Sequence, residues 1–145
     1  MQKLATGLVL AVGLVLVGCG SSNNSQNING NWTATLMDAN NNPTLSFSTS
    51  ITQMSNGSLS ITNLNFSTNS PCFVTGETAT GSFTLGGNFN GNVSGSFGMN
   101  VKSGSPGGNT LAMNGTVTGT AITGNWNLTG SSGCTGAGHF TMTRM

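Results

Sequence analysis

Apolar and polar residues alternate with a period of two along most of the chain after residue 30, and no stretch there repeats with the helical period. In the stretch 92–101, Val93, Phe97, Met99 and Val101 share one parity, whereas Ser, Gly and Asn stand between them. Successive side chains of a strand point to opposite faces. The alternation therefore predicts antiparallel sheet with one apolar and one polar face.

Turn-forming residues divide this region into about eight segments. The predicted strands are 30–37, 44–54, 58–66, 79–86, 91–101, 109–118, 120–129 and 135–144. The apolar parity changes between Ile61 and Leu64, which indicates a β-bulge near Thr62-Asn63.

All connections between the predicted strands are short, so neighbours in the sequence are expected to be neighbours in the sheet. A sheet of eight such strands leaves two unpaired edges unless it closes, and an up-and-down barrel removes both edges. We therefore expect an all-β fold, a small antiparallel up-and-down barrel of about eight strands. A β-sandwich is the alternative.

The loops of such a barrel alternate between its two ends. The longer connections, 38–43, 67–78, 102–108 and 130–134, share one end. Asp38, Glu77 and Lys102 lie in or beside these loops, and only one other charged residue, Arg144, follows residue 18. We take the three as a candidate binding rim.

The first eighteen residues have the composition of an export signal. Lys3 supplies a positive charge, and the apolar stretch 4–17 is shorter than the roughly 20 residues of a transmembrane helix. Leu16-Val17-Gly18-Cys19 resembles the lipobox of bacterial lipoproteins. The resemblance implies cleavage before Cys19 and attachment of lipid to its thiol. A plain secretory signal is the alternative.

On this resemblance the chain has three parts, namely a signal peptide (1–18), the lipidated Cys19 with a polar tether (19–29) and a barrel domain (30–145). Gly20 rather than Asp follows the cysteine, which indicates anchorage in the outer membrane or at the cell surface, facing the periplasm or the exterior. The tether enters the first strand at the end opposite to the longer loops. These loops are therefore expected to point away from the membrane.

Cys72 and Cys134 are the cysteines that remain after lipidation of Cys19. An exported chain meets oxidising conditions, and both residues fall in loops that share an end. We predict a disulfide between them, which stabilises the fold by about 4 kcal/mol on the chain-entropy estimate.

Charged residues make up 3% of the chain, and cleavage before Cys19 leaves two basic and two acidic residues. Nucleic-acid binding needs a basic stripe that neutralises phosphates, so this class of partner is excluded. The single His, His139, is expected on the polar face opposite to Phe140, which leaves no predicted metal or acid–base site. We expect neither enzyme activity nor a cofactor.

Gly30-Asn31-Trp32 at the start of the first strand resembles the Gly-x-Trp motif of lipocalins, and residues 123–130 resemble the later strands of avidins. Both families belong to the calycin group of barrels. The resemblance implies that Arg144 packs over Trp32 and closes that end of the barrel. Biotin binding is not implied, because avidins use Tyr in the biotin site and this chain has none.

Four glycines, Gly81, Gly95, Gly115 and Gly124, fall at inward positions. They indicate either room for a small ligand or relief of crowding where strands coil tightly.

Three functions stay open. The first is a non-catalytic binding module with an envelope or extracellular protein partner, similar to small lipid-anchored inhibitors of lysozymes or proteases. The others are a carrier of a small apolar ligand in the barrel interior and a structural surface component.

Overall fold

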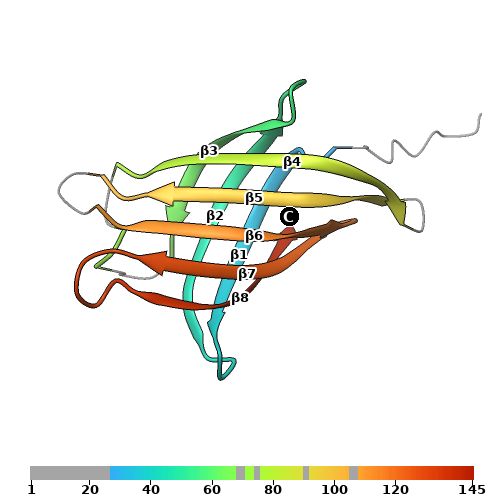
Figure 1. Cartoon of the computed structure of the whole chain (residues 1–145). Coiled ribbons are helices and arrows are strands. Elements are labelled where there is room, and N and C mark those ends of the chain that lie inside the picture. The colour runs from blue at the N-terminus through green and yellow to red at the C-terminus, as the bar shows by residue number, and fades with distance from the viewer. Residues whose placement is uncertain (1–26, 68–70, 74–75, 90–91, 105–107) are drawn as a thin grey trace, which may run out of the picture.

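A computed structural model describes residues 27–67, 71–73, 76–89, 92–104 and 108–145. This part of the chain is all β. Its strands are β1 (Gly30–Asp38), β2 (Pro43–Gln53), β3 (Ser58–Phe66), β4 (Thr78–Phe89), β5 (Asn92–Lys102), β6 (Thr110–Thr118), β7 (Ala121–Thr129) and β8 (Gly136–Arg144). They pair in sequence order and close into a barrel (Figure 1). The predicted eight-stranded antiparallel barrel is confirmed, and the sandwich alternative is wrong.

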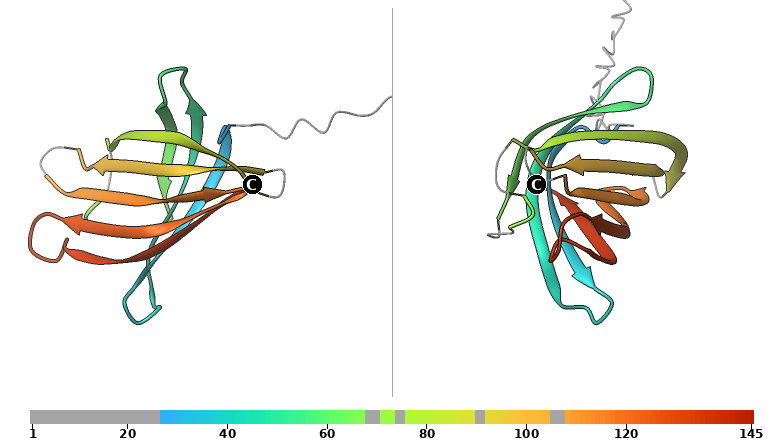
Figure 2. Two further views of the ribbon diagram at one scale, coloured as in Figure 1. Left: turned by 45° about the vertical axis from the view of Figure 1, so that its right-hand side comes forward. Right: turned by 60° about the vertical axis from the view of Figure 1, so that its left-hand side comes forward.

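The barrel closes because β1 pairs with β8 as well as with β2. The closing ladder runs from Trp32 opposite Arg144 to Asp38 opposite Gly138. Figure 2 shows the strands wrapping around a common interior. We call the end with the β1–β2, β3–β4, β5–β6 and β7–β8 connections the distal end, and the end at which β1 begins the proximal end.

The predicted apolar face lines the interior. In β1 and β2, buried residues alternate with less buried ones, as the period of two requires. The largest fully buried side chains are Trp32, Phe47, Phe83, Phe140, Ile28, Leu36, Ile51, Met99, Leu111, Met113, Ile122 and Met142.

The predicted bulge lies in β3. Thr49 of β2 faces two residues of β3, Asn63 and Leu64, because the register shifts there by one residue. Asn63 has a φ of 53°, in the left-handed region that Asn tolerates better than most residues. The buried Thr49 hydroxyl donates a hydrogen bond of 2.8 Å to the Thr62 carbonyl oxygen, so this polar group inside the barrel is satisfied.

The ladder between β3 and β4 is the shortest in the barrel. Within the described residues, two residue pairs join these strands, at Ser58 and Leu59 of β3. The β4–β5 hairpin extends past the β2–β3 turn (Figure 1). The part of β4 after Ser82 therefore has no β3 residues beside it. Leu85 is 49% exposed there, although its parity predicts a buried side chain. That prediction was wrong because parity assigns a face, whereas burial also needs a neighbouring strand of equal length.

The inward glycines mark places where neighbouring groups approach closely. A Cβ atom on Gly124 would lie 2.1 Å from the Asn114 carbonyl oxygen, and one on Gly95 would lie 2.6 Å from Cε2 of Phe83. Atoms of the next strand and of an aromatic ring therefore occupy the space over these glycines. This favours relief of crowding over room for a ligand.

Residues at the end of the predicted tether pack against the proximal end of the barrel. Ile28 is fully buried, and its carbonyl oxygen accepts a hydrogen bond of 3.0 Å from Trp32 Nε1. The Arg144 guanidinium lies 5.0 Å from the centre of the Trp32 ring and donates to the Asn27 carbonyl oxygen at 3.0 Å. Gly30 lies beside the Arg144 stem with a φ of 144°, a backbone conformation that favours glycine. The residues that pack on the barrel therefore begin before the predicted boundary at residue 30.

The predicted signal peptide, Cys19 and the tether up to residue 26 lie outside the described residues. In the described ranges, no helix has the length and apolar character needed to cross a membrane.

Candidate functional site

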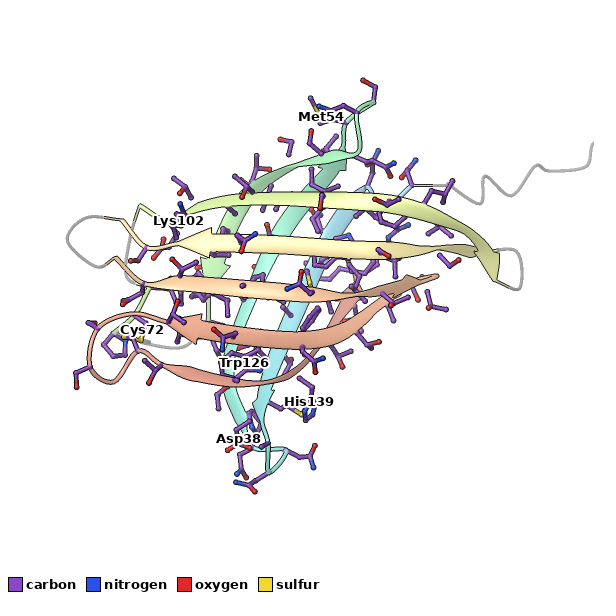
Figure 3. The ribbon with its side chains drawn as sticks, in the orientation of Figure 1. Asp38, Met54, Cys72, Lys102, Trp126 and His139 are labelled. Atoms are coloured by element: carbon purple, nitrogen blue, oxygen red, sulfur yellow. A yellow bond between two sulfur atoms is a disulfide. The ribbon has the colours of Figure 1, made fainter. Side chains whose placement is uncertain are left out.

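A recess of about 420 Å³ opens at the distal end, between the β1–β2 hairpin and the β7–β8 connection. Its lining consists of Asp38, Thr44, Leu45, Pro71, Cys72, Trp126, Leu128, Gly133, Thr135, Gly136 and Ala137. Asp38 is the one charged residue of this lining. In Figure 3, Trp126 lies between Asp38 and Cys72. A concave surface of this size, with apolar side chains and few polar groups, is the usual form of a binding site.

Trp126 is held rigidly in the wall of the recess. Its side chain is 6% exposed, and its Nε1 donates a hydrogen bond of 2.8 Å to the Met37 carbonyl oxygen on the neighbouring side of the barrel. A Cβ atom on Gly136 would lie 3.0 Å from Cη2 of the indole, so glycine at this position makes room for the ring. The shape of the recess is therefore present before any ligand arrives.

The predicted disulfide forms another part of the wall. Cys72 and Cys134 are bonded, with their Cα atoms 5.6 Å apart, and join the β3–β4 connection to the β7–β8 connection. Next to it, Phe73 is buried and stacks on Phe66 of β3 at a centroid distance of 4.7 Å. Cys72 and Phe73 of the β3–β4 connection are thus fixed at the distal end by a covalent bond and by an aromatic contact.

Asn109 joins three distal segments and was missed in the sequence. Its side chain is 3% exposed, its Nδ2 donates to the Cys72 carbonyl oxygen at 3.0 Å, and its Oδ1 accepts from the Ser131 N–H at 2.9 Å. Its own N–H donates to Ser103 Oγ at 2.9 Å. The sequence did contain a signal, because Asn109 shares the inward parity of Leu111. An amide at an inward position needs hydrogen-bond partners, which indicates a structural role.

Asp38 closes the β1–β2 hairpin at the edge of the recess. Its carboxylate accepts hydrogen bonds from the N–H groups of Asn40 at 2.8 Å and Asn42 at 2.9 Å, and from Nδ2 of Asn42 at 3.1 Å. The bonds from Asn42 are the main reason why the pKa of Asp38 lies below its ordinary value, and the nearby His139 lowers it further. The charged carboxylate is therefore part of the turn.

The three residues of the predicted rim lie at the distal end but do not form one cluster. Asp38 ends β1, whereas Lys102 ends β5 on the opposite wall of the barrel. Glu77 precedes β4, whose first residue pairs with Lys102. Figure 3 shows Asp38 and Lys102 on different sides of the distal mouth. Of the three, Asp38 borders the recess.

His139 lies on the outer face of β8, opposite Met37 of β1, and is partly buried. Figure 3 places it close to Asp38, yet no hydrogen bond joins the two side chains among the described contacts. In the part of the chain that the structure describes, there is no group of three or more His, Cys, Asp or Glu residues that could hold a metal ion. The lining of the recess combines apolar side chains with two threonines, Thr44 and Thr135, and one carboxylate, that of Asp38.

No family model, no curated protein and no solved structure matches this chain. The geometry of the distal recess and the chemistry of its lining are therefore the basis for a functional proposal.

Proposed function

We propose that the chain is a non-catalytic binding module of the cell envelope, anchored through lipid on Cys19 to the outer membrane or the cell surface. Its distal end contacts an envelope or extracellular protein. The lipobox resemblance supports the anchor, and the Gly-x-Trp motif supports a calycin-like barrel as the carrier of the site. The distal recess is the observation that carries the binding role.

The recess has the rigidity of a binding site. The hydrogen bond to Met37 holds the Trp126 indole, whereas the disulfide and the buried Asn109 both hold Cys72 next to the β7–β8 connection. A preformed surface loses little conformational entropy when a partner binds, so affinity is gained without new contacts.

The position of the recess suits a large partner. β1 begins at the proximal end, where the predicted tether (19–29) leads into the barrel, and the recess lies at the opposite end. A protein approaching from the side away from the membrane meets this surface first. The interior-carrier alternative is less well supported, because neighbouring atoms occupy the space over Gly95 and Gly124.

Site-specific photo-crosslinking in the producing cells tests this function. A benzophenone amino acid in place of Thr135, which lines the recess, is expected to give a discrete crosslinked product. The same amino acid in place of Thr116, exposed on the outer face of β6, is the control and is expected to give none. Leu128→Trp, which enlarges a half-buried side chain in the lining of the recess, should remove the product obtained at position 135.

Equal products from both positions, or no product from either, would favour the structural surface component instead. The anchor is tested separately. Globomycin treatment and the Cys19→Ser variant are expected to remove the lipid mass from the protein and to release it from the membrane fraction.

A further inference from the structure

Among the described residues, the exposed large apolar side chains all lie toward the proximal end. They are Met54 in the β2–β3 turn, 50% exposed, Leu85 in β4, 49% exposed, and Met145 after β8, 74% exposed. Single exposed apolar residues are ordinary on a protein surface. Their common position, rather than their number, is the informative feature.

Met54 and Leu85 belong to adjoining segments. The Phe83 N–H donates to the Gly57 carbonyl oxygen at 2.8 Å, and the Gly57 N–H donates to the Met54 carbonyl oxygen at 3.1 Å. The turn that carries Met54 therefore lies against β4 two residues before Leu85. Figure 3 shows Met54 projecting from the barrel on the side away from Asp38.

Side-chain charge is concentrated at the other end. Asp38, Glu77 and Lys102 lie at the distal end. Arg144 lies at the proximal end, but its guanidinium covers the Trp32 ring and donates to a backbone carbonyl oxygen. An end without free side-chain charge approaches lipid without the cost of removing an ion from water.

The predicted tether keeps this same end near the bilayer. The chain advances eight residues from Cys19 to Asn27, a distance of at most about 29 Å even when fully extended. Asn27 contacts Arg144 at the proximal end. The tether makes the effective concentration of the lipid surface high. A contact of low intrinsic affinity is therefore sufficient to hold the proximal end against the bilayer.

We propose that Met54 and Leu85 insert into the interfacial region of the bilayer, so that the anchored barrel stands on its proximal end. Apolar side chains bind this region in proportion to the apolar area that they bury. The contact rests on the proposed anchor at Cys19, and it adds a second attachment that fixes the orientation of the domain. The distal recess is then held facing away from the lipid.

Fluorescence in vesicles tests the contact. Met54 is replaced by the environment-sensitive amino acid dansylalanine in the full chain, produced in cells that lipidate it and reconstituted in vesicles of phosphatidylcholine and phosphatidylglycerol. A second protein carries the probe in place of Asn40, exposed in the distal β1–β2 hairpin. With spin-labelled acyl chains in the vesicles, the probe at 54 is expected to shift to the blue and lose intensity. The probe at 40 is expected to keep its emission in water.

Two failures are distinguishable. If the protein mass shows no lipid on Cys19 and the protein stays in the supernatant when vesicles are sedimented, the anchor is wrong and the contact is overturned with it. If the lipidated protein sediments with the vesicles but the probe at 54 behaves like the probe at 40, the anchor stands and the contact alone is overturned.

A charge placed in the contact supplies the matched variant. In the protein with the probe at 54, Leu85→Asp is expected to restore the emission seen in water and to abolish quenching by the lipid. Thr80→Asp places the same charge at an exposed position in the distal half of β4 and should leave the quenching intact. Equal effects of the two variants would overturn the assignment of Leu85 to the membrane.

Discussion

Glycine determines how closely β6 and β7 approach each other. Gly115 and Gly124 are paired across these strands, and a Cβ atom on Gly124 would lie 2.4 Å from Gly115 Cα as well as 2.1 Å from the Asn114 carbonyl oxygen. Since these atoms belong to the backbone, a rotamer change cannot relieve the contact. The residue type at this position therefore sets the local coiling of the barrel.

Gly124→Ala is expected to lower the free energy of unfolding by about 1 to 3 kcal/mol, the usual cost of overpacking. Urea denaturation followed by Trp fluorescence measures it. Gly98→Ala is the control, because the nearest atom to its Cβ is Ser82 Oγ at 3.3 Å, on a side chain that can rotate. Equal stabilities of the two variants would contradict the close approach of β6 and β7.

The charged form of Asp38 stabilises the β1–β2 turn. Because the pKa of Asp38 is lowered in the folded protein, its contribution is present above the ordinary pKa of 3.8 and is lost as the pH falls through the folded value. The amide resonances of Asn40 and Asn42 are expected to report this loss together in an NMR titration. Asp38→Asn keeps an acceptor oxygen but carries no titrating charge. In this variant the amide resonances of Asn40 and Asn42 should not show that pH-dependent change.

Among the elements, the β3–β4 connection depends on the Cys72–Cys134 disulfide, which links residues 62 positions apart. The double variant Cys72→Ser, Cys134→Ser is expected to lose about 4 kcal/mol of unfolding free energy, mainly through the larger entropy of its unfolded chain. Far-UV circular dichroism should show the strands retained. An unchanged stability would mean that Asn109 and Phe73 hold the connection without the covalent bond.

The lengths of the strands were largely predictable from the sequence. Which of their side chains a neighbouring strand buries was not. All eight strands begin and end within three residues of the predicted limits, because alternation and turn residues are local properties. Parity predicts that Leu85 is buried, yet it is exposed because the β3–β4 ladder stops at Ser58 opposite Ser82, before β4 reaches Leu85. Conversely, Asn109 was left out of the site because its three partners come from segments far apart in the chain.

For the whole molecule, a filled interior and a rigid distal recess distinguish a binding module from a carrier. Since large apolar side chains fill the barrel and neighbouring atoms cover Gly95 and Gly124, palmitate is expected to leave the midpoint of thermal unfolding unchanged. Calorimetry at rising palmitate concentration measures this. A midpoint that climbs with concentration would indicate binding to the folded state and would restore the carrier alternative.

The sequence alone determined the strand pattern, the barrel topology, the bulge in β3 and the pairing of Cys72 with Cys134. Each of these follows from local alternation, chain connectivity or the number of cysteines left to pair. Only the tertiary structure decided that Ile28 seals the proximal end, that Asp38 and Lys102 stand on opposite walls, and that a recess forms beside Trp126. The physical reason is that a recess belongs to the space between segments distant in the sequence, and its shape depends on the curvature with which the sheet closes.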